Sequence, residues 1–423
     1  MNERASKWSA LGERASEWSA LDEPASGSPA LGERSSGSPA VAASAPAPEV
    51  VRARAYLSRV AEPPAAALAG FVEQMGPVEA ADRVRRGAVP EKVAVETAAR
   101  RGVDRAEADL TAAEAVGARL LVPEDPDWPQ WQFAAFALSG SADLAPPIAL
   151  WTRGPGRAVE AGERAVAVVG ARAATGYGMH IAGDFGAGLA DRGFTVVSGA
   201  ALGIDGAAHR GALAVEGPTV AVLACGIDRA YPTSHTALLR RIAEVGLVVT
   251  EYPPGAVPAR HRFLVRNRLL AGLAGGTVVV EAGLRSGAQR TAADARALGR
   301  LVMAVPGPVT SGMSAGCHEL IRAGALLVSR VEEVLETVGR LGIDLATEPA
   351  RPERPTDGLD PVQVLVLDAL PARAARDIRW LALEAGVPAE AVRPALVELE
   401  RRGLAEYREG RWQRPPRKRS GGG

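Results

Sequence analysis

The stretch "RAVAVVG" (residues 164–170) decides the fold, because small and β-branched apolar residues follow one another in it without a polar break. Later runs of the same kind are "FTVVSG" (194–199), "TVAVLACG" (219–226), "GLVVTE" (246–251), "TVVVEAG" (277–283), "LVMAVPG" (301–307) and "ALLV" (325–328). Continuous apolar runs, unlike alternating ones, are typical of strands whose two faces are both buried. The runs therefore predict the strands of a mostly parallel sheet.

Helical sequence lies between these runs. In "GMHIAGDFGAGLADRG", for example, Ala182, Phe185 and Leu189 are spaced to share one side of a helix. Alternating strands and helices imply right-handed crossover connections. We therefore predict an α/β fold with a doubly wound, mostly parallel sheet over roughly residues 160–340.

Bulk composition sets limits on the kind of protein. The chain has 423 residues, and its 49 basic residues balance 49 acidic ones, so a nucleic-acid site has to be a local basic patch. Its 2 cysteines suit a reducing cytosol, and its 5 histidines fit no metal-ligand spacing. The sequence has neither an apolar run long enough to span a membrane nor an apolar signal core. We expect a cytoplasmic protein without metal, cofactor or membrane contact.

The flanking sequence divides into further units. Residues 1–48, with an imperfect ten-residue repeat that begins "ERASKWSALG", are expected to be disordered because they offer little apolar surface to bury. Residues 49–118 read as a small helical domain, and 119–340 as the main domain. A Pro-rich linker (341–360) leads to 361–414, where three helical segments and a hairpin signal at Glu409-Gly410 outline a winged helix. Residues 415–423 form a basic, Gly-rich tail.

In a parallel sheet, ligands gather beyond the carboxyl ends of the strands, so the loops at these ends are the candidate site. The loop "VGARAATGYG" (169–178) has glycines that allow close backbone approach, and the helix after it offers free N–H groups to an anion. A phosphate loop that ends in Gly-Lys-Ser/Thr is excluded, because no lysine occurs from 93 to 417. Asp205 and His209 are four residues apart, but as a catalytic pair they are a weak signal.

Two arginines, Arg266 and Arg268, stand in the stretch "FLVRNRLLAGLAGG" (263–276) just before an apolar helix. We place them near the start of that helix, where the macrodipole is mildly unfavourable to cations. This cost indicates that they serve an anion. The alternative is a salt bridge to Glu251 or Glu281. No paired carboxylates, Ser-His-Asp order or metal cluster can be assigned, so we predict no catalytic residues.

Several ordered motifs resemble the DNA-processing protein DprA (Smf) family over about residues 120–340. They include "GARAATGYG", "SGAALGIDGAAHRGAL", "FLVRNRLLAGL" and "VVVEAGLRSGAQRTAADARALGR". The resemblance implies an extended Rossmann-like fold with an N-terminal sterile-alpha-motif-like (SAM-like) domain and a C-terminal winged-helix-like domain. It further implies a homodimer, not an enzyme, that binds single-stranded DNA and loads the RecA recombinase onto it during natural transformation or recombination.

The resemblance also implies which residues contact DNA. They are Gly170, Arg172, Ser198, Gly199, Phe263, Arg266, Asn267, Arg268, Ser286 and Gly287. Where the family loop reads S-G-x-A-R-G-I-D, this chain has Leu202 in place of the arginine. We add Arg290 to the DNA-binding set, on the hypothesis that it restores the charge lost at 202. Arg266 and Arg268 are then expected to clamp the DNA backbone, with the apolar helix fixing their direction.

Two alternative functions stay open. One is a Rossmann-type nucleotide phosphoribohydrolase, which would use Glu281, although "GGTVVVEAG" only loosely echoes the motif of those enzymes. The other is a regulatory DNA-binding protein that acts through the C-terminal segment, where Arg408, Arg411 and Arg414 precede the basic tail.

Overall fold

The computed structural model describes residues 45–340, 344 and 356–416. The predictions for residues 1–44, for most of the linker and for the basic end of the tail lie outside the described residues. Within the described part of the chain, no helix is long and apolar enough to cross a membrane.

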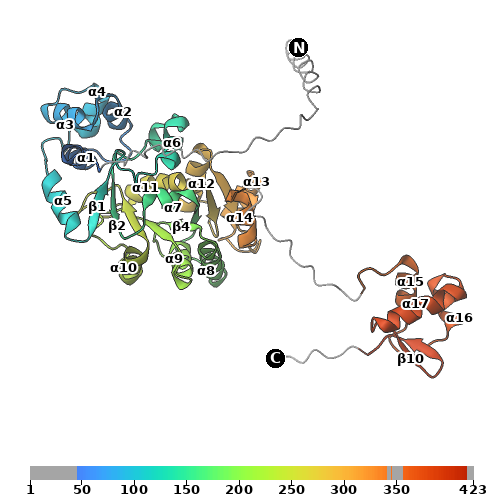
Figure 1. The fold of residues 1–423 in the computed structure, drawn as a ribbon. Coiled ribbons are helices and arrows are strands. Elements are labelled where there is room, and N and C mark those ends of the chain that lie inside the picture. The colour runs from blue at the N-terminus through green and yellow to red at the C-terminus, as the bar shows by residue number, and fades with distance from the viewer. Residues whose placement is uncertain (1–44, 341–343, 345–355, 417–423) are drawn as a thin grey trace, which may run out of the picture.

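A nine-stranded sheet forms the centre of the main domain (Figure 1), in the order β1-β2-β6-β5-β4-β3-β7-β8-β9. In this spatial order, the seven strands from β6 through β5, β4, β3, β7 and β8 to β9 are parallel to one another, whereas β2 pairs antiparallel with both β1 and β6. The strands are β1 (Ala118–Leu121), β2 (Leu150–Arg153), β3 (Ala165–Val169), β4 (Thr195–Ser198), β5 (Thr219–Val222), β6 (Leu247–Thr250), β7 (Gly276–Val279), β8 (Leu301–Ala304) and β9 (Leu326–Leu327). Each predicted run from 164 to 328 matches one of these strands, although β7 begins one residue before its run, and this confirms the doubly wound α/β fold.

Helices cover both faces of this sheet, so every residue of the strands β3 to β7 is buried. One face is packed by α8 (Gly176–Asp191), α9 (Ile204–Ala214), α10 (Thr236–Val245) and α14 (Val331–Val338). The other is packed by α6 (Gln130–Ser139), α7 (Ala158–Glu163), α11 (Arg260–Leu273), α12 (Gly287–Ala297) and α13 (Ala315–Arg322). Two single 3-10 turns, η1 (Ala142–Leu144) and η2 (Thr233–His235), complete the domain.

The N-terminal helices lie at the β1 side of the sheet (Figure 1). They are α1 (Pro48–Val60), α2 (Ala66–Met75), α3 (Pro77–Arg86), α4 (Glu91–Thr97) and α5 (Ala106–Glu114). Leu68, Phe71 and Val72 are buried on one face of α2, as their spacing indicates. These helices share one apolar core with β1, β2 and α10. Arg262 of α11 binds Glu62 across the same contact, at 2.7 and 3.0 Å.

The C-terminal segment contains the expected three helices and a hairpin. They are α15 (Pro361–Ala369), α16 (Ile378–Ala385), α17 (Ala389–Arg401), β10 (Glu406–Arg408) and β11 (Arg411–Gln413). Glu409 and Gly410 have positive φ angles of 48° and 83°, so they make the tight turn of the hairpin. The assignment of this unit as a winged helix stays a prediction.

Candidate functional site

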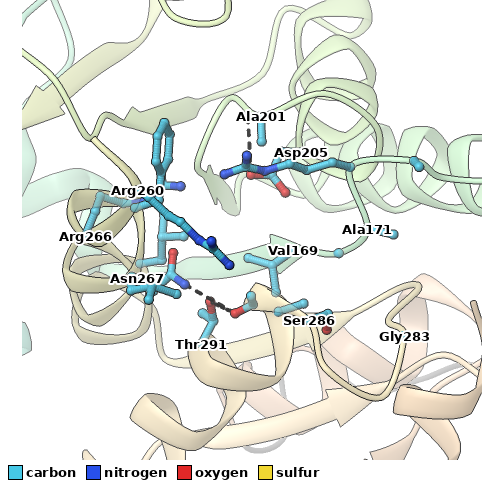
Figure 2. A pocket seen from close by; sticks show the side chains of 18 of the residues that line it. Val169, Ala171, Ala201, Asp205, Arg260, Arg266, Asn267, Gly283, Ser286 and Thr291 are labelled. Atoms are coloured by element: carbon cyan, nitrogen blue, oxygen red, sulfur yellow. Dashed lines mark hydrogen bonds between the residues drawn. The ribbon is translucent and has the colours of Figure 1, made fainter. Parts of the chain in front are cut away.

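A pocket of about 770 Å³ opens at the carboxyl edge of the parallel strands. It lies where the strand order reverses, because β3 pairs with β4 on one side and with β7 on the other. The loop after β3, the loop after β7 and the first turns of α11 form its walls (Figure 2). Ligands of open α/β sheets bind at such reversal points.

Basic side chains dominate the charge of this pocket. Arg172, Arg260, Arg266 and Arg285 line it, and Asp205 is the carboxylate among its lining residues. Arg172, Arg260 and Arg285 are exposed. Among the described residues, no carboxylate lies within ion-pairing distance of Arg260 or Arg285. Figure 2 shows Arg260 pointing into the pocket from the start of α11. The pocket therefore presents cations that no protein carboxylate neutralises.

Two aromatic rings form one end of the pocket. The centroids of Tyr231 and Phe263 are 5.3 Å apart, with the rings inclined at 49°. The guanidinium of Arg172 lies over the ring of Phe263, 4.7 Å from its centroid. Phe263 is thus covered, whereas Tyr231 is 39 % exposed and leaves its ring accessible at the pocket edge.

Arg266 is buried in the inner wall instead of lying at the surface. Its Nη1 donates hydrogen bonds to the carbonyl oxygens of Gly199, at 2.9 Å, and of Val222. Burial lowers the pKa of its guanidinium, and the nearby Asp205 carboxylate opposes that effect. Because its donors hold the ends of β4 and β5 together, Arg266 shapes the pocket and adds to its positive field.

Arg268 does not reach the pocket, so its predicted role as a phosphate clamp is wrong. Its side chain is 2 % exposed and its Nη2 is 2.7 Å from Oε1 of Glu251, which is 5 % exposed. This is the salt bridge that the sequence left as the alternative. The predicted position near a helix start is also wrong, because α11 begins at Arg260 and places Arg266 and Arg268 two turns inside the helix.

Asn267 and the Ser286-Gly287 turn join two walls of the pocket. Nδ2 of Asn267 donates to the carbonyl oxygen of Gly287 at 3.3 Å (Figure 2). Ser286 is the N-cap of α12, and its Oγ accepts a hydrogen bond from the N–H of Gln289 at 3.4 Å. These contacts fix the start of α12 against α11, which leaves the Ser286-Gly287 backbone facing the cavity.

Gly170 lines the pocket at a point with no room for a side chain. A Cβ there would lie 2.5 Å from Cγ1 of Ile204 and 2.9 Å from the carbonyl oxygen of Glu281. Ser198 and Gly199, in contrast, are buried behind the wall and do not line the cavity. The Ser198 hydroxyl donates a hydrogen bond to the carbonyl oxygen of Val168 at 2.6 Å. The expected contact of Ser198 and Gly199 with DNA is therefore not supported.

Arg290 does not line the pocket, so its compensation for Leu202 gains no support here and stays a prediction. Its Nε donates to Oδ1 of Asp294 at 2.8 Å, and its Nη2 lies 3.7 Å from Asp143. Arg290 and Asp294 are one turn apart on α12, so the local pair holds the guanidinium along the helix. The free cations of the pocket come instead from Arg260 and Arg285.

Glu281 and the Asp205–His209 pair have structural partners. The Glu281 carboxylate accepts hydrogen bonds from the N–H and the hydroxyl of Thr175, at 2.9 and 2.6 Å, which anchors the start of α8. Asp205 accepts from the backbone N–H groups of Gly199 and Ala201, and burial raises its pKa. His209 lies 2.7 Å from Thr219 Oγ1, and burial lowers its pKa to about 3.

These contacts give no support to a catalytic role for Glu281 or for the His209–Asp205 spacing. In the described residues, no group of three or more His, Cys, Asp or Glu side chains is placed to hold a metal ion.

The sequence did not single out Arg260, Tyr231 or Arg285 as site residues. Arg260 sits in "PARHRF", where nothing marks a helix start: the N-cap is Ala259, whose side chain makes no capping hydrogen bond. Arg285 stands in the quoted loop after β7, so its position beyond a strand end is the signal that could have identified it.

A doubly wound α/β sheet with a pocket at its reversal point is the architecture of Rossmann-like proteins. The family model for DNA recombination-mediator protein A matches residues 119–339. The chain belongs to this family, which the motif resemblance had indicated.

Individual relatives agree with the family model. A Mycobacterium tuberculosis (strain H37Rv) protein, named as a candidate DNA processing protein DprA, is 56% identical over 367 residues, covering 86% of this chain and 94% of the relative. Protein Smf of Escherichia coli K12 is 45% identical over 174 residues, which cover 41% of this chain and 46% of that protein. The crystal structure of DprA from Streptococcus pneumoniae matches with a TM-score of 0.56 and 29% identity, covering 69% of this chain and 98% of that one.

Proposed function

We propose that the protein is a single-stranded DNA-binding recombination mediator and that the pocket at the β3–β7 reversal point is its DNA site. The observation that carries this proposal is the set of unpaired arginines, Arg260 and Arg285, beside Arg172 at the pocket rim. Guanidinium groups without a protein carboxylate are suited to phosphate oxygens, which they bind through charge-assisted hydrogen bonds.

The exposed ring of Tyr231 favours a single strand over a duplex. Bases of a duplex are stacked and paired inside the helix, whereas an unpaired base can stack on an aromatic side chain. Tyr231 leaves its ring accessible beside the cation at Arg172, so one nucleotide can contact both with its base and its phosphate. At Gly287 an added Cβ would meet no protein atom nearer than Nδ2 of Asn267, at 4.0 Å, so the missing side chain lets the strand approach the backbone closely.

A direct test compares single-stranded and duplex DNA of equal length in a binding assay at two salt concentrations. The proposal predicts tighter binding to the single strand, little sequence preference and a steep loss of affinity with added salt, because each neutralised phosphate releases counterions. Equal affinity for the duplex, or affinity that ignores salt, would overturn the proposal.

We also propose that the protein acts as a homodimer that passes the bound strand to the RecA recombinase in the cytoplasm. The support for these steps is membership of the recombination-mediator family and the motif resemblance. Sedimentation analysis tests the dimer. Loading of RecA onto a strand coated with single-strand-binding protein tests the hand-over, and a rate that does not change when this protein is added would contradict it.

A further inference from the structure

A second groove, of about 350 Å³, lies between α10 and the β2–β6 side of the sheet. Its apolar lining includes Leu223, Ile227, Leu239 and Val248. Three arginines line it as well, each from a different element: Arg153 ends β2, Arg229 lies in the loop after β5, and Arg240 is on α10.

The three arginines carry charge that the protein leaves unneutralised. Within the described ranges, Arg153, Arg229 and Arg240 have no carboxylate within 4 Å, although the neighbouring Arg241 pairs with Glu244 at 3.2 Å. Asp228 is the carboxylate that lines the groove, and its Oδ1 accepts a hydrogen bond from the N–H of Gly255 at 2.8 Å. An apolar lining with unpaired guanidiniums suits a ligand that has both apolar surface and repeated negative charge.

The backbone around the groove is held in place without any ligand. Gly226 donates its N–H to the carbonyl oxygen of Ala256 at 2.9 Å, and Arg229 donates its own to Gly226 at 3.0 Å. On the other side, the N–H of Gly156 donates to Gly246 at 3.1 Å, which ties the turn after β2 to the end of α10. A fixed backbone reduces the ordering cost of binding.

One loop separates this groove from the first pocket. Residues 227–230 line the second groove, and the next residue, Tyr231, lines the first. A strand that passes over Tyr231 therefore meets the rim of the second groove directly.

We infer that the second groove binds a further stretch of the same single DNA strand after it leaves the first pocket at Tyr231. This inference rests on the proposed function. Phosphates contact Arg153, Arg229 and Arg240, and bases lie against the apolar lining. The alternative occupant, an acidic segment of a protein partner, would contact the same arginines without affecting DNA affinity.

The test compares two oligodeoxythymidylates, one of about 6 nucleotides, short enough for the first pocket alone, and one of about 20 that can span both grooves. The variant replaces the three groove arginines: Arg153→Gln, Arg229→Gln and Arg240→Gln. The matched control replaces three exposed arginines that form ion pairs and line neither groove: Arg83→Gln, Arg241→Gln and Arg322→Gln.

We expect the groove variant to bind the short oligonucleotide like the parent. For the long one, three lost phosphate contacts should lower the slope of log affinity against log salt by about 2, at roughly 0.7 per phosphate. The control should behave like the parent with both lengths.

Three results would overturn the inference: unchanged binding of the long strand, which favours an acidic protein segment; equal loss with both lengths; or the same loss in the control. A parent that binds neither oligonucleotide would instead refute the proposed function itself. Failure of the second groove alone is therefore distinguishable, because the short oligonucleotide still reports on the first pocket.

Discussion

Replacing Arg268 by methionine should destabilise the protein strongly and leave DNA binding unchanged. Methionine keeps much of the side-chain volume but removes the cation that lies 2.7 Å from Glu251. The Glu251 carboxylate, only 5 % exposed, is then left buried without its partner. Breaking a buried pair in this way costs about 3–5 kcal/mol. For a domain as large as the main α/β domain, this loss of stability corresponds to a fall in melting temperature of roughly 6–10 °C.

The loss of stability should depend on pH. Burial raises the pKa of Glu251 and the guanidinium of Arg268 opposes the rise, so without Arg268 the folded-state pKa of the carboxyl goes up further. A carboxyl whose folded pKa exceeds its unfolded pKa favours folding at low pH, and that contribution is lost as pH rises through the folded pKa. The deficit of Arg268→Met should thus be small near pH 5 and full near pH 8.

Thermal unfolding followed by circular dichroism at several pH values measures this deficit. A double variant, Arg268→Met with Glu251→Leu, is the control, because removing both charges should recover most of the stability. A melting temperature within about 2 °C of the parent at pH 8, or a deficit that does not change with pH, would refute the reasoning. So would a reduced salt slope for single-stranded DNA, since Arg268 does not line the pocket.

Three further changes have distinct expected outcomes. Tyr231→Ala should weaken binding of oligodeoxythymidylate by roughly 5- to 100-fold in affinity assays, because base stacking on the ring is lost. Tyr231→Phe keeps the ring and should bind like the parent. For an abasic strand, which has no base to stack, Tyr231→Ala and the parent should have similar affinities. Glu281→Gln should lower the melting temperature by about 2 °C, because one of the two hydrogen bonds from Thr175 is lost, and neither protein should release base from nucleoside monophosphates. Arg290→Ala should bind DNA like the parent but have a lower melting temperature, because buried Asp294 loses its ion-pair partner. Weakened DNA binding by this variant would show that Arg290 contacts DNA.

The sheet could be predicted from sequence because its signal is local. Runs such as "RAVAVVG" need no knowledge of the rest of the chain: continuous apolar residues imply strands buried on both faces, and β3 is buried throughout. The hairpin turn at Glu409-Gly410 is local in the same sense, since positive φ is required there.

The site could be predicted only in part because burial and pairing are long-range properties. The motif resemblance, together with strand-end position for the loop after β3, named Gly170, Arg172, Phe263 and Gly287, and all four line one pocket. Nothing local distinguishes Arg268 from Arg266, yet one pairs with Glu251 across the core and the other binds two carbonyl groups. Because the start of α11 has no capping side chain, the sequence did not show that the helix begins as early as Arg260.

The central claim is that the arginine-lined pocket at the β3–β7 reversal point binds single-stranded DNA. Its most direct test is the salt dependence of oligodeoxythymidylate affinity for Arg260→Gln with Arg285→Gln, measured by fluorescence anisotropy beside the parent and the control pair Arg83→Gln with Arg241→Gln. The account predicts an unchanged melting temperature and a slope smaller by about 1.4, at roughly 0.7 for each lost phosphate contact, with no change in the control. Parent-like affinity and slope in the Arg260 and Arg285 variant would contradict it.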